Sequence, residues 1–148
     1  MNPAINKHNT GGCFLIQPIG ENPIFTREQF SDEHREIKQM VREFAGERIL
    51  ENKKEIEKFN KELSLSLIRE IGELGLLGVD IPEEYGGSGL SIREASIILE
   101  EVNHSGGNSA ACHAQMYIMG TLLRHGSDAQ KQKYLPKIAS GELRLQAF

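Results

Sequence analysis

Apolar residues recur at helical spacing in several stretches of the chain, and short polar or glycine-rich segments separate these stretches. In the first stretch, the apolar positions follow one another at steps of three and one, which places them on one face of a helix. That predicted buried stripe consists of Ile37, Met40, Val41, Phe44 and Ala45. The same spacing predicts helices over about 31–51, 63–74, 91–102, 109–125 and 127–139.

Start signals support two of these helices. Ser91 is followed three residues later by Glu94, and Ser127 by Gln130, so each serine can cap a helix while the longer side chain returns to the cap. Pro136 lies inside the last predicted helix and is expected to interrupt or kink it. The highly charged segment 53–62 is expected to form a turn and the approach to the second helix.

Between the second and third helices lies a long segment that we expect to be an ordered loop. Pro82 ends any helix there, and Gly86, Gly87 and Gly89 supply backbone angles that other residues avoid. The glycines precede a helix, but the preceding strand and the spacing of a dinucleotide fingerprint are both missing, which argues against phosphate binding. The expected apolar anchors of the loop are Val79, Ile81, Tyr85 and Leu90.

The two ends of the chain differ from its helical middle. Residues 1–25 are predicted to be an irregular arm, and residues 26–142 a helical domain. Residues 143–148 alternate apolar and polar positions, which is the period of a strand. We therefore predict an all-α antiparallel helical bundle that is truncated in the first strand of a following domain. The family resemblance described below implies that this following domain is a β-barrel.

Composition limits the classes of function. A net charge of −4, with acidic and basic residues interspersed, gives no reason to expect a nucleic-acid or membrane-surface partner. No run of apolar residues is long enough for a membrane span. Cys13 and Cys112 lie far apart without a metal-binding spacing, so we expect no metal site and no disulfide framework. These features predict a cytoplasmic protein.

Pattern alone leaves the chemistry open. The sequence presents no evident pairing of a nucleophile with a base, nor of two carboxyl groups. His113 lies on a helix of small residues, where a buried and satisfied polar group is the ordinary role for histidine. The residues alone therefore leave the function unreadable; the resemblance described below implies no catalytic residue in this chain.

Two segments carry a resemblance to a known family. Residues 74–90, LGLLGVDIPEEYGGSGL, and residues 126–142, GSDAQKQKYLPKIASGE, are similar to hallmarks of the acyl-CoA dehydrogenases, in the same order and at the same distance. The resemblance covers about residues 25–148. The arm is similar, over a shorter stretch, to bacterial members related to very-long-chain acyl-CoA dehydrogenases.

The resemblance implies an enzyme that oxidises acyl-CoA to trans-2-enoyl-CoA with FAD in fatty-acid β-oxidation. It implies an electron-transfer flavoprotein as the partner that reoxidises the flavin, and a homo-oligomer when the protein is complete. The catalytic base and most contacts to FAD belong to parts of the family that follow this segment. We therefore expect the chain alone to bind no FAD.

The resemblance also assigns residues to sites. Phe148 falls where the family's next strand approaches the flavin ring, which makes it a candidate cofactor contact. In the helix over 109–125, small side chains would leave room for an apolar acyl tail. The candidate substrate-binding residues are Ser109, Ala110, Cys112 and His113. Close packing of two helices also favours small residues, so that alternative stays open.

Two other functions remain as alternatives. The chain could be a free-standing helical interaction module that kept the bundle and lost the chemistry. It could also be the matching domain of an acyl-CoA oxidase-like flavoenzyme, because oxidases share the helical domain. The sequence leaves the preferred acyl length undetermined.

Overall fold

The computed structural model describes residues 25–145. The chain divides into two compact units, Met1–Ser31 and Asp32–Phe148. In the described part of the first unit, the 3₁₀-helix η2 (Arg27–Gln29) begins at a capping box between Thr26 and Gln29. The rings of Phe25 and Phe30 stack with their centroids 5.8 Å apart.

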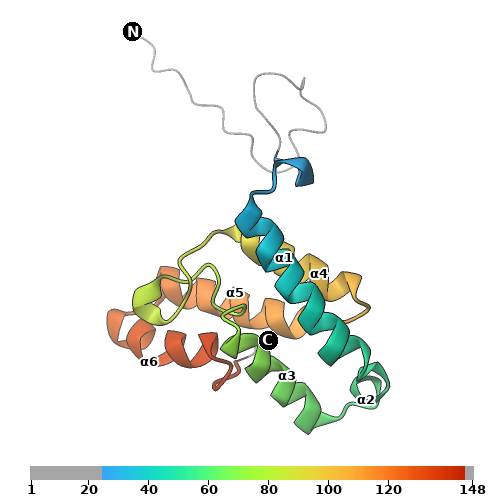
Figure 1. Cartoon of the computed structure of the whole chain (residues 1–148). Coiled ribbons are helices and arrows are strands. Elements are labelled where there is room, and N and C mark those ends of the chain that lie inside the picture. The colour runs from blue at the N-terminus through green and yellow to red at the C-terminus, as the bar shows by residue number, and fades with distance from the viewer. Residues whose placement is uncertain (1–24, 146–148) are drawn as a thin grey trace, which may run out of the picture. The chain divides into compact units, whose positions relative to one another are not determined.

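All regular elements in the described part of the second unit are helices, which confirms the all-α fold class (Figure 1). In chain order its elements are α1 (Asp32–Phe44), the π-helix η3 (Ala45–Leu50), α2 (Lys53–Glu57), α3 (Lys61–Glu73), the 3₁₀-helix η4 (Glu83–Tyr85), α4 (Ile92–His104), α5 (Ala110–His125) and α6 (Asp128–Ala139). Helix α1 packs on α4, and α5 packs on α6. Every helix in this part of the chain is too short or too polar to cross a bilayer.

One continuous core joins these helices. Its fully buried large side chains come from α1, the loop after α3, α4, α5 and α6, and they are Val41, Leu77, Ile81, Ile98, Met119, Leu135 and Ile138. The predicted anchors Val79, Ile81 and Tyr85 are buried, and Leu90 is partly buried against the core. The loop between α3 and α4 is therefore fixed by apolar side chains, as its sequence predicts.

Several details differ from the sequence-based expectations. Met40 belongs to the predicted buried stripe but is 42% exposed. Leu74 is 44% exposed, although its spacing from Leu67 and Ile71 predicts a buried position on the second helix. Segment 53–62 contains the short helix α2 instead of only a turn. Helix α6 continues past Pro136 to Ala139, so the predicted interruption does not occur; the proline removes only the amide donor for the Gln132 carbonyl.

The three glycines of the loop have two different roles. Gly86 and Gly89 have φ angles of +80° and +66°, as predicted, and only glycine adopts this region without strain. Gly87 is required for space instead, because an added Cβ would collide with the carbonyl oxygen of Ile81. Both capping boxes are present, at Ser91 and Ser127.

The last described residues, 143–145, lie against the helical core and bond to α5. Residues 143–145 have no regular secondary structure, so the predicted strand is not seen there, and residues 146–148 lie outside the described residues. The amide of Leu145 donates to Gln115 Oε1 at 3.1 Å, and Gln115 Nε2 donates to the Leu145 carbonyl at 3.0 Å. The backbone of Leu145 thus bonds a helix side chain where a strand would bond a neighbouring strand.

A buried carboxylate at the contact of α1 and α4 makes stability depend on pH. Glu94 accepts hydrogen bonds from the Ser91 amide at 2.8 Å and the Ser91 hydroxyl at 2.6 Å, and it lies 2.7 Å from His34 Nε2. Burial alone would raise the pKa of Glu94, but these hydrogen bonds outweigh burial and lower the pKa from 4.5 to about 2.

Because the pKa is lower in the folded state, Glu94 stabilises the fold above its unfolded pKa, and this contribution is lost as pH falls from about 4.5 to 2. We expect the free energy of unfolding to drop by on the order of 2 kcal/mol across that window from Glu94 alone. Urea unfolding at pH 2.5–7, followed by circular dichroism, measures the drop. The variant Glu94→Gln should show a shallower dependence, and an identical slope would contradict this assignment.

Candidate functional site

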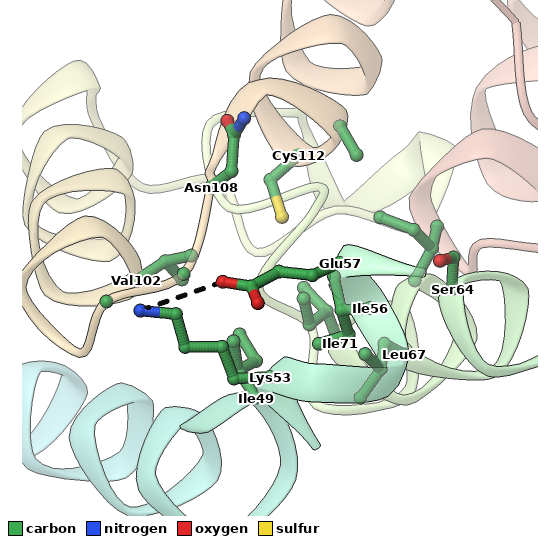
Figure 2. A pocket seen from close by; sticks show the side chains of 14 residues that line it. Ile49, Lys53, Ile56, Glu57, Ser64, Leu67, Ile71, Val102, Asn108 and Cys112 are labelled. Carbon is green, nitrogen blue, oxygen red and sulfur yellow. Dashed lines mark ion pairs between the residues drawn. The ribbon is translucent and has the colours of Figure 1, made fainter. Parts of the chain in front are cut away.

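A hollow of about 280 Å³ opens between the beginning of α5 and the helices α2 and α3 (Figure 2). Its walls are mainly aliphatic. The lining residues are Ile49, Lys53, Ile56, Glu57, Ser64, Leu67, Ile68, Ile71, Val102, Gly106, Gly107, Asn108, Ala111 and Cys112. The hollow is nearly twice as large as an engineered apolar cavity of about 150 Å³ that binds benzene. Because protein interiors are normally close-packed, a space of this size marks a candidate ligand site.

The beginning of α5 leaves this space because its side chains are small. The segment between α4 and α5 packs tightly against Ile49 and Val102 at Gly107. A Cβ added at Gly107 would lie 2.8 Å from Ile49 Cγ2 and 3.0 Å from the Val102 carbonyl oxygen. The next turn presents Ala111 and Cys112, which are too short to fill the volume in front of them. In Figure 2, the Cys112 sulfur points from α5 towards the side chains of α2 and α3.

Helix α2 forms the side of the hollow opposite α5. Ile56 faces the interior and is partly buried, whereas Lys53 and Glu57 carry charge at its edge. The Lys53 ammonium lies 4.0 Å from the Glu57 carboxylate, and both side chains are more than half exposed, so this ion pair contributes little stability. The arrangement is an apolar interior with a charged, solvated edge.

Local structure on both sides of α2 sets its position. The π-helix η3 precedes it, and Asn52 Nδ2 donates to the Arg48 carbonyl at 2.9 Å across the turn between them. After α2 the chain turns through Phe59, which has a φ of +58° and is 91% exposed. A bulky residue in this region is strained, and π-helical turns occur frequently at functional sites.

The four predicted substrate-binding residues do not share one face of α5. Cys112 is buried and lines the hollow. Ser109 is buried beside Asn103, which donates from Nδ2 to the Ser109 hydroxyl at 2.8 Å and accepts from the Ser109 amide at 3.2 Å. Ala110 and His113 are exposed, and His113 stacks on Tyr117 with ring centroids 6.4 Å apart. Successive helical residues turn by about 100°, so the pairs 109/112 and 110/113 face different ways.

Burial controls the chemistry of the cysteine in the hollow. Desolvation raises the pKa of the Cys112 thiol to about 11. The thiol is therefore neutral at physiological pH, and a neutral thiol is a poor nucleophile. Cys112 therefore lines the hollow as a neutral, apolar wall residue.

His113 lies along a second groove, between α4 and α5, of about 230 Å³. Asp80 also lines it, and Asp80 Oδ1 is a buried atom without a hydrogen-bond partner. The remaining lining residues are Ile92, Ala95, Ser96, Leu99, Met116, Tyr117, Gly120, Thr121 and Arg124. No cluster of three or more metal-ligating side chains occurs within residues 25–145.

Reasoning from the sequence missed two residues, one that lines the hollow and one elsewhere, on α5. Ile56 is the single apolar residue in a run of lysines and glutamates at 53–58, so it was assigned to a charged turn. Gln115 is a buried polar residue on α5 that binds Leu145. A signal existed for Gln115, because it occupies an apolar face with Cys112, Met116 and Met119. The predicted cofactor contact Phe148 lies outside the described residues.

Comparisons with known proteins match most of the chain. The family model for the N-terminal domain of acyl-CoA dehydrogenases matches residues 31–142. A probable acyl-CoA dehydrogenase of Bacillus subtilis (strain 168) is 40% identical over 134 residues, which are 89% of this chain and 22% of that protein. The mitochondrial isovaleryl-CoA dehydrogenase of Pongo abelii is 38% identical over 116 residues, covering 76% of this chain and 27% of that protein.

The same similarity extends to solved structures. The acyl-CoA dehydrogenase of Bacillus anthracis, complexed with FAD, superposes with a TM-score of 0.79 at 37% identity, and the match covers 89% of this chain and 23% of that chain. The chain thus spans about a quarter of the length of the relatives that it matches.

Proposed function

The chain belongs to the acyl-CoA dehydrogenase family, and from that premise we propose that it is the N-terminal helical part of an FAD-dependent acyl-CoA dehydrogenase whose hollow accepts the tail of the acyl group. The observation that carries this proposal is the aliphatic hollow of about 280 Å³ beside Cys112. The reaction of the whole enzyme is the oxidation of an acyl-CoA to a trans-2-enoyl-CoA. When bound, FAD would supply the hydride acceptor for that reaction, and an electron-transfer flavoprotein would be the partner that reoxidises the enzyme.

The contribution of this chain is binding. Each methylene that enters the hollow leaves water for an aliphatic environment, which stabilises the complex by about 0.8 kcal/mol. Ile49, Leu67 and Ile71 form such an environment, and the neutral Cys112 thiol adds no charge to it. We assign no described residue to FAD, and Phe148 stays a predicted contact.

The relatives leave two classes of substrate open. Isovaleryl-CoA dehydrogenases act on a short branched acyl group, as their name states, and they match this chain as well. The size of the hollow favours a longer, unbranched tail and hence a role in fatty-acid β-oxidation. Homo-oligomerisation and a cytoplasmic location remain predictions from the family and the composition.

Protection of Cys112 from alkylation tests whether acyl tails enter the hollow. A Cys13→Ser variant leaves Cys112 as the single thiol, and its raised pKa predicts slow reaction with N-ethylmaleimide at pH 7. Decanoyl-CoA at ten times its dissociation constant should slow the reaction about tenfold further, because the occupied state does not react. Intact-mass spectrometry measures the alkylated fraction.

Acetyl-CoA is the matched control, because it carries the same CoA moiety without an aliphatic tail. It should leave the alkylation rate unchanged. Equal rates with decanoyl-CoA and acetyl-CoA would rule out the hollow as the tail site.

A further inference from the structure

The chain that follows α6 is held against the helical domain at several points, and the last of these in the described residues is Leu145. The Leu143 amide donates to the Lys137 carbonyl at 2.8 Å, and the side chains of Leu143 and Leu145 pack against the core. Gly141 lies so close to α3 that an added Cβ would be 2.7 Å from the Ile68 carbonyl oxygen. This connection is therefore fixed to the surface of the bundle.

The hydrogen bonds at Leu145 come from one buried side chain. Gln115 is 6% exposed and lies on the buried face of α5 with Cys112, Met116 and Met119. An apolar side chain would fill this place without the cost of burying an amide, so the polar atoms of Gln115 need partners. Leu145 supplies both, because its amide donates to Gln115 Oε1 and its carbonyl accepts from Gln115 Nε2. Gln115 is thus matched to the backbone of this one residue.

This pair of bonds has the pattern of strand pairing. In an antiparallel sheet, two opposite residues exchange both of their N–H···O=C bonds, and the Gln115 amide offers Leu145 the same donor and the same acceptor. Side chains of an extended chain alternate between two faces, so a slip by one residue reverses the faces of the residues that follow. A slip would also withdraw the Leu145 side chain from the core. Polar and apolar contacts therefore select the same register at this point.

We propose that Gln115 is a positioning residue that sets the register in which the chain passes from the helical domain into the residues after Leu145. The proposal rests on the proposed function, because its consequence concerns Phe148, the predicted cofactor contact. Phe148 follows Leu145 by three residues, which span at most about 10 Å even when fully extended. An anchor at Leu145 thus restricts this contact in advance, and less ordering remains for the step in which FAD binds.

Replacing Gln115 with methionine tests the proposal, because methionine has a similar length, no hydrogen-bond donor and only a weak acceptor. Hydrogen exchange followed by NMR should show the protection of the Leu145 amide falling by about tenfold or more in Gln115→Met. The amides in the middle of α5 should stay protected. Gln115→Asn has an amide that is one methylene too short to reach Leu145, so it should give the same result, and it serves if Gln115→Met unfolds.

The consequence for the cofactor is measured in the complete enzyme of the proposed function. Without the bonds from Gln115, binding of FAD must also order the segment around Leu145. The dissociation constant for FAD should therefore rise about tenfold in Gln115→Met, as expected for the loss of one or two net hydrogen bonds. Flavin fluorescence measures this constant, and the absorption bands of the bound flavin show whether its surroundings change.

Gln130→Met is the matched control. Gln130 Oε1 accepts from the Ser127 amide at 2.8 Å in the capping box of α6, so the same substitution removes a bond between side chain and backbone at another place. It should leave the Leu145 amide and the affinity for FAD unchanged.

Three results would overturn the proposal. These are unchanged protection of the Leu145 amide in Gln115→Met, unchanged affinity for FAD in that variant, and an equal loss of FAD affinity in Gln115→Met and Gln130→Met. An unsubstituted enzyme that binds no FAD overturns the proposed function instead, and exchange of the Leu145 amide then still decides whether Gln115 sets the register.

Discussion

Replacing Gly72 with alanine should lower the free energy of unfolding by about 3 kcal/mol, because the space beside this glycine is filled by main chain. Gly72 is buried in α3, where the end of α6 crosses it. An added Cβ would lie 2.5 Å from the Ser140 carbonyl oxygen and 2.8 Å from the Gly141 nitrogen. These atoms belong to the backbone, so they cannot move aside as a side-chain end could. The penalty exceeds the gain of up to about 1 kcal/mol that alanine brings to a helix interior.

Gly120 provides the matched control for Gly72. It also lies inside a helix, α5, but no atom of another element lies within 4 Å of the position of its Cβ. Gly120→Ala should therefore raise the free energy of unfolding by up to about 1 kcal/mol. Urea unfolding monitored by circular dichroism measures both variants. If both substitutions stabilise the protein, the close approach of α3 and the end of α6 is wrong.

The main helices could be predicted because their signals are local. The capping boxes at Ser91 and Ser127 fix the beginnings of α4 and α6, and glycine or polar clusters mark where helices end. The first helix shows where such signals fail. Its apolar stripe predicts one α-helix to about residue 51, but residues 45–50 are π-helical, which changes the number of residues per turn. Hydrophobic spacing of 3.6 residues carries no information about such a change.

Exposure was harder to predict than helicity. Met40 and Leu74 have apolar side chains at the correct spacing, yet both border a groove with Phe44 that is edged by glutamates. Periodicity identifies the face of a helix, but not whether another element covers all of it. The same reason explains Ile56, because a single apolar residue among charges has no periodic partner that would mark α2 as a wall.

The four substrate-binding residues stay predictions, and the structure shows only how they are arranged around α5. Small residues at the beginning of α5 indicated a space for an apolar ligand, and the structure has a hollow there. Of the four residues named, Cys112 alone lines it, because residues 109–113 cover more than one full turn of helix and so point in all directions. The far wall comes from residues about 55 positions earlier in the chain, and local sequence cannot establish a contact of that kind.

Neutralising Glu101 should lower the free energy of unfolding by about 2 kcal/mol, because it leaves two cations of α1 without their shared partner. The Glu101 side chain on α4 is 3% exposed and lies 3.2 Å from Lys38 Nζ and 3.0 Å from Arg42 Nε. Burial would raise the pKa of Glu101, but the hydrogen bonds from Arg42 and Lys38 outweigh it and hold the pKa below 4.5. In Glu101→Gln, the amide cannot balance two positive charges, although Lys38 and Arg42 are exposed enough to reach water in part.

Two further variants show whether removal of the Glu101 charge causes this loss of stability. Glu55→Gln makes the same chemical change in the exposed pair with Lys58, where the expected effect is below about 0.5 kcal/mol. The triple variant Lys38→Met, Arg42→Met and Glu101→Leu replaces the whole cluster with apolar side chains, and it should recover most of the stability lost in Glu101→Gln. Urea unfolding at pH 7 measures all three. If the triple variant is less stable than Glu101→Gln, the ion pairs of Glu101 with Lys38 and Arg42 themselves stabilise the contact of α1 with α4. In that case the stability lost in Glu101→Gln does not come from an imbalance of charge.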